Sequence, residues 1–374
     1  MRIEELGYRR PSVGDLVRTL ARHRRGKIPP APGATRTGFA VPLAILHGEP
    51  LVAYSGIVPE APLGLASVLG RREAPRRAWF LLSPTWSLEN ASLVRRMRKL
   101  AVLHRWRHPG HRLVFLCNTA AEARLLQDAG EAAIVHNKTT HVSEQVFRPL
   151  DGVTREFDAV YNAQLLPWKR HELALEIPRC AFVFYRGLHR GASTSASEQA
   201  FIRGHLRQAP RHVFLNDFDA EGRPVRLEAE AVNAQLARAA VGLCLSAEEG
   251  AMFACVEYLL AGLAVVTTPS RGGRGLFVDG WSCLEVPADA GAVAEATAAL
   301  RERRLPPAEV REAALRRIAP HRACFADLVG GIYARARIAA PPPGIGPARR
   351  PAVMAWMPVD EARRRVRERL VDDV

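Results

Sequence analysis

Short apolar runs alternate with longer stretches of helical spacing along most of the chain. In the second half, six such runs have the length of strands: Phe157–Ala163, Cys180–Tyr185, His212–Asn216, Val241–Ser246, Ala264–Thr268 and Cys283–Pro287. Continuous apolar runs separated by helical spans are typical of parallel strands that are buried on both faces. The pattern therefore predicts a doubly wound α/β domain in this half.

The first half repeats this alternation less regularly. Its candidate strands are Phe39–Leu46, Leu51–Gly56, Ala78–Ser83, Arg112–Asn118 and Ala132–Asn137, and its candidate helices are Leu88–His104 and Ala120–Ala129. The prediction is a second, less typical α/β domain. Proline and polar residues after Phe147 mark the joint, and Ala339–Gly344 marks a second break. We therefore expect domains at 1–150 and 151–338, followed by a linker and helix at 339–374.

The helical segment Val359–Leu370 near the end of the chain admits two interpretations. It is either a helix that crosses back to the body of the protein or a loosely attached appendage.

Charge separates the two halves of the chain. Its 374 residues include 53 Lys and Arg against 38 Asp and Glu, a net charge of +15, and 48% are hydrophobic. This balance excludes a disordered or membrane-spanning chain. Residues 1–150 hold 23 basic and 11 acidic residues, which leaves a net +3 for the remainder. A basic first domain attracts polyanions, anionic lipids or phosphorylated substrates, without specifying which.

The cysteines and the first residues of the chain indicate a compartment. Six cysteines are scattered without a C-x-x-C pair, which is typical of buried thiols under reducing conditions. The stretch 1–25 has no apolar core of a signal peptide, and no apolar run approaches 18 residues. We therefore expect a cytoplasmic protein, with contact to a membrane surface left open.

The stretch 241–280 carries the clearest chemistry. A predicted strand ends in Glu248-Glu249-Gly250, and a helix is expected to begin immediately. The N–H groups of Gly250, Ala251 and Met252 would then be the unpaired first-turn donors, which suit a diphosphate. Glu257, about two turns into this helix, can accept two hydrogen bonds from a ribose diol.

A lone helical glutamate is usually a solvent-facing residue. The neighbours of Glu257 are apolar, however, and an unpaired carboxylate among them is costly to bury. We therefore expect a ligand there.

The pattern Glu249-Gly250-x6-Glu257-x-Leu259-x2-Gly262, followed by Gly272-Gly273, resembles the donor-site signature of retaining nucleotide-sugar glycosyltransferases of family 4. This resemblance implies the GT-B fold, two Rossmann-like domains facing across a cleft. It also implies that Glu249 contacts the donor sugar, that Glu257 binds the ribose, and that Gly272 and Gly273 let backbone amides approach the donor.

Two further segments resemble the same family. Phe157–Ala163 with Lys169 is similar to its first strand and phosphate loop, which implies that Lys169 pairs with the diphosphate. His136 to Pro149 is similar to its interdomain segment. Ala163-Gln164 stands where the family has Gly-Arg, so Arg170 or Arg274 is expected to supply the second phosphate cation.

The resemblance implies a retaining hexosyltransferase that uses a nucleotide-diphosphate sugar as co-substrate, with no other cofactor and no metal. Retention in this family resembles a front-face displacement, for which no catalytic triad is needed. The sequence contains no HExxH pattern. His136, His141 and Asn118 are acceptor-side candidates, although a structural role is the favoured interpretation for each of them.

Other functions are open at this point. A degenerate subunit that binds a nucleotide sugar without transferring it is one, and a basic nucleic-acid-binding protein is a less favoured one, because no recognition motif is present. The helix over 87–108 is either a membrane-surface helix or an ordinary amphipathic helix with a solvated basic face. The charge points to an anionic acceptor or surface.

Overall fold

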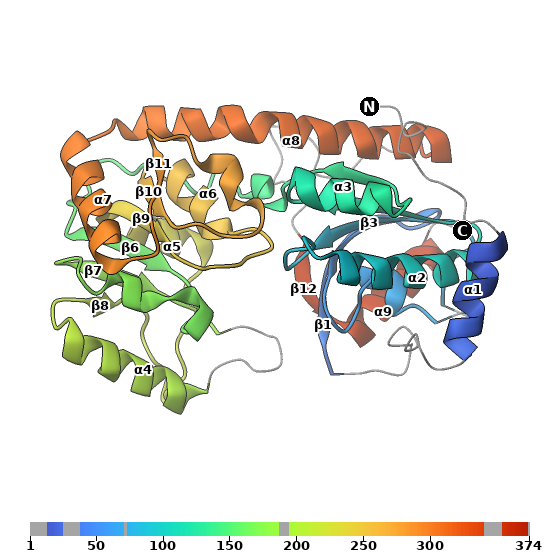
Figure 1. The fold of residues 1–374 in the computed structure, drawn as a ribbon, viewed down its shortest axis with the longest axis horizontal. Coiled ribbons are helices and arrows are strands. Elements are labelled where there is room, and N and C mark those ends of the chain that lie inside the picture. Colours follow the sequence, from blue (N-terminus) through green and yellow to red (C-terminus); the bar gives the residue numbers. More distant parts are fainter. Residues whose placement is uncertain (1–12, 25–37, 71–72, 187–193, 340–353, 373–374) are drawn as a thin grey trace. The chain divides into compact units, whose positions relative to one another are not determined.

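The computed structural model describes residues 13–24, 38–70, 73–186, 194–339 and 354–372, which fold into two compact units (Figure 1). Unit 1 comprises Met1–His141 and His321–Val374, and unit 2 comprises Val142–Pro320. In each unit, helices cover a six-stranded sheet. The α/β fold class with two sheets is thus confirmed.

The sheet of unit 1 is mixed. Its strands follow the order β12-β1-β2-β3-β4-β5, in which β2 to β5 are parallel and β1 and β12 are antiparallel to their neighbours. The bounds are β1 (Ala40–His47), β2 (Leu51–Ile57), β3 (Ala78–Pro84), β4 (His111–Cys117), β5 (Ala133–Val135) and β12 (Ala355–Pro358). All five strands predicted in the first half are confirmed, and β12 was not predicted.

Helices from distant parts of the chain cover the two faces of this sheet. They are α1 (Val13–Arg24), α2 (Ala91–Arg107), α3 (Ala120–Asp128), α8 (Pro307–Ala336) and α9 (Val359–Asp372). The apolar sides of α2, α3 and α9 share one core with the sheet, and the second half of α8 packs in the other. Because β2 to β5 advance in one direction, their right-handed crossovers occupy a single face and leave the other to α8.

Helix α2 uses its apolar side inside unit 1. Asn90 caps its start by accepting hydrogen bonds from the amides of Ser92 and Leu93. Met97 and Leu100 are buried in the core. This arrangement favours the second interpretation of 87–108, an ordinary amphipathic helix with a solvated basic face. No helix of the described ranges is long and apolar enough to cross a bilayer.

The division between the units differs from the predicted one. The chain first passes from unit 1 to unit 2 at residue 142 instead of 151. Arg311 of α8 explains this, because its guanidinium donates to the carbonyls of Glu144 and Phe147, both at 2.6 Å. These bonds tie the predicted joint to unit 2. The chain returns to unit 1 at Pro320 within α8, so that 321–338 also lies outside the domain predicted for it.

The C-terminal segment is part of the core of unit 1, and the alternative of a loosely attached appendage is wrong. Strand β12 pairs antiparallel with β1 over four residues. On α9, the side chains of Val359, Ala362 and Val366 are buried in the same core as α2. The predicted proline-rich linker lies almost wholly outside the described residues.

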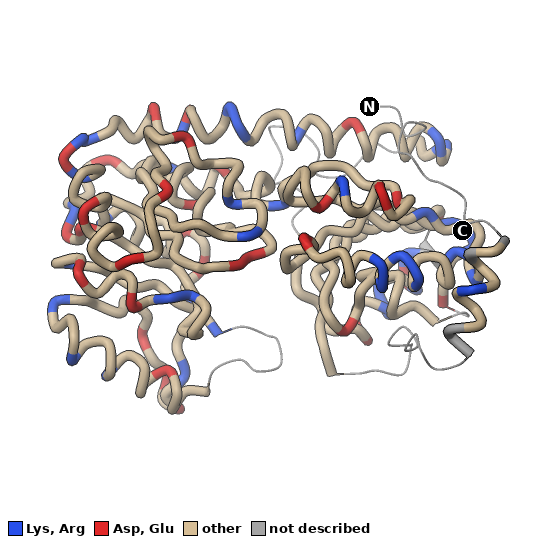
Figure 2. Tube along the Cα trace, viewed as in Figure 1, with Lys and Arg blue, Asp and Glu red and all other residues tan. Residues whose placement is uncertain are grey.

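With these boundaries, the two units differ clearly in net charge. Unit 1 holds 32 Lys and Arg against 16 Asp and Glu, whereas unit 2 holds 21 against 22. Figure 2 shows some of these basic positions along α2. The whole positive excess of the protein therefore belongs to unit 1.

The sheet of unit 2 is entirely parallel, in the order β11-β10-β9-β6-β7-β8. Its strands are β6 (Phe157–Asn162), β7 (Cys180–Val183), β8 (Val213–Phe214), β9 (Ala239–Cys244), β10 (Ala264–Thr267) and β11 (Cys283–Glu285), and all six were predicted. Its helices are α4 (Ser195–Gln208), α5 (Ala229–Ala237), α6 (Phe253–Leu260), α7 (Ala290–Arg303) and the first part of α8. The strand order reverses between β6 and β9, where parallel sheets form a ligand crevice.

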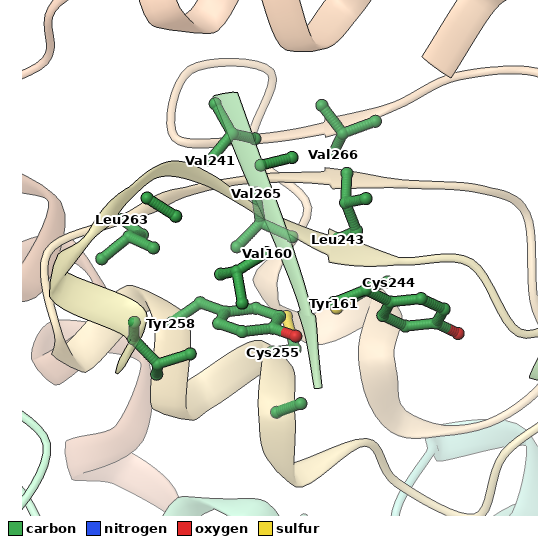
Figure 3. Packing of buried hydrophobic residues seen from close by; sticks show 14 of the residues in the cluster. Val160, Tyr161, Val241, Leu243, Cys244, Cys255, Tyr258, Leu263, Val265 and Val266 are labelled. Carbon is green, nitrogen blue, oxygen red and sulfur yellow. The ribbon is translucent and has the colours of Figure 1, made fainter. Parts of the chain in front are cut away.

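Helix α6 approaches this sheet closely because β9 carries a glycine. Figure 3 shows Tyr258 of α6 among buried residues of β6, β9 and β10. A Cβ on Gly242 would lie 2.4 Å from the ring of Tyr258. The tyrosine hydroxyl accepts a hydrogen bond from the amide of Asn162 at 2.5 Å. Gly242 thus lets Tyr258 fasten α6 to the end of β6.

A pair of histidines joins the end of α2 to the start of β4. His104 Nε2 lies 2.9 Å from His111 Nδ1, and His111 Nε2 lies 2.8 Å from the carbonyl oxygen of Pro75. The carbonyl can only accept, so Nε2 of His111 carries the proton and its Nδ1 accepts from His104. Both imidazoles are therefore neutral.

The same arrangement occurs in unit 2. His205 at the end of α4 lies 2.9 Å from His212 Nδ1, and His212 Nε2 lies 2.7 Å from the carbonyl oxygen of Ile177. In both units the chain reads H-x4-P-x-H. Each unit thus locks one β-α-β crossover with two neutral histidines.

Burial lowers the pKa of eight described histidines below the ordinary value of about 6.5. These are His104, His111, His136, His141, His171, His205, His212 and His321. For His111, His141 and His205 the pKa falls to about 4. Below pH 6.5 the unfolded chain binds protons that the folded chain excludes, so stability is lost as the pH falls from 6.5 toward 4.

We expect the free energy of unfolding to fall between pH 7 and pH 5 by up to about 1.4 kcal/mol per pH unit for each such histidine. Thermal unfolding followed by circular dichroism measures this change. In His205→Gln the amide still donates to His212 but does not titrate, so the pH dependence should be weaker. Equal melting temperatures at pH 7 and pH 5 would contradict the neutral state of these histidines.

A second prediction concerns α9. Val366→Asp places a carboxylate in the core of unit 1 and should destabilise it by more than about 3 kcal/mol. Arg369→Asp makes a similar substitution at an exposed position of the same helix and should change stability little. Urea unfolding of both variants tests whether the C-terminal segment is integral to the unit.

Candidate functional site

The predicted donor residues lie at one edge of the unit 2 sheet. Lys169 follows β6, Glu249 follows β9, and Thr268 follows β10 directly. The carboxyl ends of parallel strands meet at the same edge, and β6 and β9 flank the reversal of strand order. This is the position at which open α/β sheets bind ligands.

An ion pair joins two residues that the sequence placed in separate segments. The Lys169 ammonium bonds to Glu249 Oε1, and the same oxygen accepts a hydrogen bond from Ser246 Oγ at 2.7 Å. Lys169 is 7% exposed and Glu249 is 9% exposed. The hydroxyl of Tyr161 donates to the carbonyl of Lys169 at 2.7 Å and fixes the backbone of that turn.

Two guanidinium groups lie beside this pair. Arg170 donates to the carbonyl of Leu245 at 2.6 Å and to Thr268 Oγ1 at 2.7 Å. Arg274 donates to the carbonyls of Ser246 and Thr268, at 3.0 and 2.6 Å. Burial and the neighbouring charge of Arg274 lower the pKa of Arg170, as expected for two close cations. Both groups thus form hydrogen bonds at the ends of β9 and β10.

The backbone of Arg170 is also unusual. Its φ of 52° lies in the left-handed region, between two short 3₁₀ turns. A residue other than glycine adopts this backbone conformation at a cost of about 1 kcal/mol or more. Such strain is concentrated at functional sites, and here it directs the guanidinium toward the strand ends.

These side chains leave positive charge uncompensated. Lys169, Arg170 and Arg274 carry three positive charges, and the carboxylate of Glu249 is the one that bonds directly to any of them within the described residues, while Glu172 acts on Arg170 without a bond. Neither guanidinium makes an ion pair within the described part of the chain, and Arg274 is only 2% exposed. A desolvated cation without a counter-charge is costly, so the edge is suited to an anion.

The helix after Glu249 begins later than expected, so the predicted donor amides are not at its first turn. Helix α6 starts at Phe253, with Met252 as its cap residue. Gly250 and Ala251 belong to the preceding turn, in which the carbonyl of Gly250 accepts from the amide of Gly273 at 3.2 Å. The first turn of α6 has no side-chain cap, so its amides, and not those of Gly250 and Ala251, are the helix-start donors without an intrahelical partner.

Glu257 lies in the second turn of α6 and points toward the end of β6. Its Oε2 accepts from Asn162 Nδ2 at 3.0 Å, and the side chain is partly exposed. Burial raises its pKa to about 7, against opposing effects of Asn162 and Arg226. The carboxylate is therefore half protonated near neutral pH, and its Oε1 has no partner among the described residues.

An aromatic side chain lies near both carboxylates. Tyr185, two residues beyond β7, keeps 40% of its surface exposed. Burial of the hydroxyl raises its pKa to about 12, and the charges of Glu249 and Glu257 add to this effect. The exposed Arg226, in the loop after β8, acts on both Tyr185 and Glu257. Tyr185 and Arg226 thus lie on the side of the edge away from β10.

Gly272 and Gly273 hold the turn that carries Glu249. Gly272 has a φ of 110°, and a Cβ there would lie 1.8 Å from the carbonyl oxygen of Glu249. The amide of Glu249 donates in turn to the carbonyl of Arg271 at 3.0 Å. The amide of Gly273 donates to the carbonyl of Gly250, so it stabilises this turn.

The acceptor-side candidates are built into unit 1. Asn118 donates to the carbonyl of Pro84 at 3.3 Å and is 4% exposed. His136 Nε2 lies 2.8 Å from His141 Nε2, and His136 Nδ1 lies 3.1 Å from the carbonyl oxygen of His321. Burial lowers the pKa of both His136 and His141. These contacts favour the structural interpretation of all three residues.

Sequence reasoning missed several residues of the site. Ser246 and Asn162 bind the two glutamates directly, and Tyr258 and Thr268 hold the elements that carry them. The signal for Asn162 and Thr268 was present, since each is a polar residue at the end of a buried strand. Within the described ranges, no three His, Cys, Asp or Glu side chains cluster as a metal site would require.

No protein-family model matches the sequence, and no curated protein matches it. Among solved structures, Anabaena Alr3699/HepE in complex with UDP-glucose is similar, with a TM-score of 0.50 and 14% identity over 68% of this chain and 72% of that chain. Sucrose-phosphate synthase from Thermosynechococcus elongatus gives a TM-score of 0.45 and 16% identity over 71% and 69% of the two chains. A glycosyltransferase from Rickettsia africae gives 0.45 and 11% identity over 74% and 80%. At these identities the first likeness is one of fold, and it matches the GT-B architecture of two α/β units.

Gly272→Ala should disrupt the turn of Glu249, because the added Cβ meets a backbone oxygen and the φ disfavours any side chain. We expect a loss of stability of about 2 kcal/mol or more. Gly275→Ala, three residues later, adds a Cβ with nothing within 4 Å and is the matched control. Chemical denaturation compares the two, and equal stability would mean that the turn does not depend on Gly272.

Proposed function

We propose that the protein is a nucleotide-sugar glycosyltransferase and that unit 2 binds the donor. The observation that carries this proposal is that Arg170 and Arg274, beside Lys169 at the β6/β9 reversal, make no ion pair within the described residues. A diphosphate supplies the missing negative charge, and the uncapped start of α6 supplies further donors.

In this arrangement, Arg170 and Lys169 bind the diphosphate at the ends of β6 and β9. When the bond between the anomeric carbon and the diphosphate breaks, negative charge grows on the leaving oxygen. Fixed cations in a partly desolvated site stabilise that charge more than water does. We propose on this basis that the side chains, without a metal, supply the positive charge that the leaving group requires.

The two glutamates bind the remaining parts of the donor. Glu249 has one carboxylate oxygen without a partner among the described residues, which can accept a hydroxyl of the transferred hexose. Glu257 presents Oε1 to the ribose while Asn162 holds Oε2. The base then extends toward Tyr185 and Arg226, whose ring and guanidinium offer flat surfaces for stacking.

We propose transfer with retention, by attack of the acceptor hydroxyl on the face from which the diphosphate leaves. The bond from the acceptor oxygen to the anomeric carbon forms as the bond to the diphosphate breaks. The acceptor proton passes to a phosphate oxygen of the leaving group. The protein contributes mainly positioning and charge stabilisation to this step.

The charge of unit 1 supports an anionic acceptor, because basic residues exceed acidic ones by two to one there. The HepE structure holds UDP-glucose, which makes UDP-glucose the first donor to test.

A panel of UDP-, GDP-, ADP- and TDP-sugars should contain at least one that raises the melting temperature of the protein. Arg170→Ala should weaken binding of that donor by about tenfold or more, because a charge-assisted contact is lost. Arg203→Ala, at an exposed position of α4, is the control. If no donor binds, the proposal is wrong. If a donor binds but no nucleoside diphosphate is released with any acceptor extract, the protein is a nucleotide-sugar-binding partner.

Donor binding should also depend on pH through Glu257. Its pKa of about 7 means that the carboxylate becomes protonated as the pH falls through 7 and loses an acceptor for the ribose hydroxyls. Affinity measured by calorimetry should therefore rise between pH 6 and pH 8. Glu257→Gln should bind more weakly and remove this dependence, and an unchanged pH profile in the variant would exclude Glu257 as its source.

A further inference from the structure

The contact between Lys169 and Glu249 affects how tightly the donor and the diphosphate product can bind. The proposed function assigns Lys169 to the diphosphate and Glu249 to the sugar, yet the two side chains bond to each other. The two side chains are only 9% and 12% exposed, so the contact is shielded from water. A shielded ion pair is stronger than an exposed one.

The two oxygens of Glu249 have different environments. Oε1 accepts from both Lys169 and Ser246, whereas Oε2 accepts from no described residue. The ammonium of Lys169 has three donors and uses one of them on Glu249. Lys169 can therefore contact a phosphate oxygen and Glu249 at the same time, and Oε2 remains available to a sugar hydroxyl.

We propose that the carboxylate of Glu249 offsets the charge of Lys169, repels the diphosphate and thereby weakens the binding of the nucleoside diphosphate product. This proposal rests on the proposed function. A bound diphosphate gains attraction from Lys169 and suffers repulsion from the adjacent carboxylate. The intact donor has the same repulsion, but its sugar recovers free energy through a hydrogen bond to Oε2, which the product lacks.

Glu249 thus favours the donor over the product, because only the donor offsets the repulsion with a hydrogen bond to Oε2. Product release limits the turnover of many enzymes, and a fixed negative charge beside the product phosphates speeds this step. Ser246 acts as a positioning residue, because its hydroxyl holds Oε1 on the Lys169 side and leaves Oε2 directed away from it.

The test measures the binding of UDP, GDP, ADP and inorganic pyrophosphate to the full chain by calorimetry. Glu249→Gln preserves the size of the side chain and removes its charge, and it should bind the preferred diphosphate about tenfold more tightly than the wild-type protein. Glu249→Asp keeps the charge and should bind it with nearly wild-type affinity.

Three outcomes are distinguishable. If the wild-type protein binds no diphosphate, the proposed function fails. If it binds one and Glu249→Gln binds it equally or more weakly, the proposed function stands. The proposal that Glu249 weakens product binding is then overturned. If Glu249→Asp gains affinity as Glu249→Gln does, the effect is one of shape, and the proposal is overturned as well.

Ser246 gives an independent arm of the test. Ser246→Ala should lower kcat for donor turnover severalfold with little change in KM, because Glu249 loses its fixed orientation. Ser246→Thr keeps the hydroxyl and should restore most of the rate. An equal loss of rate in both variants would assign Ser246 a packing role only. A donor of known turnover, identified from the panel above, is the substrate in these assays.

Discussion

The buried guanidinium of Arg274 holds the candidate site together. It binds the carbonyls that follow β9 and β10, and its other nitrogen lies 3.5 Å from the sulfur of Met252, the residue that precedes α6. One guanidinium thereby holds three segments together: the end of β9, the end of β10 and the start of α6. The cost of burying that charge is offset by the carbonyl dipoles to which it bonds. The geometry of Glu249 and α6 depends on this group.

Much of the fold and part of the site could be predicted from the sequence. All eleven strands expected from apolar runs are present, because buried parallel strands leave a strong and local signal. Strand β12 could not be expected, since its pairing with β1 joins positions more than 300 residues apart. The glutamates were found by their spacing and family resemblance. Their contacts with Lys169 and Asn162 depend on which strands are neighbours, and the sequence does not state this.

The start of α6 shows why a motif does not fix local geometry. An acidic turn followed by small residues is a typical helix start, and the sequence favours a helix from Gly250. In the structure, the amide of Gly273 binds the carbonyl of Gly250 and holds this turn in an extended connection. The helix therefore begins at Phe253, after a turn that is held by Gly273, 23 residues downstream of Gly250. The two units also differ in charge, since unit 1 holds the entire positive excess while unit 2 is close to neutral.

The division of unit 1 into two chain segments affects how the protein is made. A ribosome completes the first segment and all of unit 2 before it reaches residues 355–372. Until then, β1 is an edge strand with one side unpaired, and the core that will receive Val359 and Val366 is open on one side. Unpaired edges and exposed apolar surface promote aggregation. Unit 2 can therefore fold during translation, whereas unit 1 must wait for its last strand and helix and will be the part of the nascent chain that most needs a chaperone.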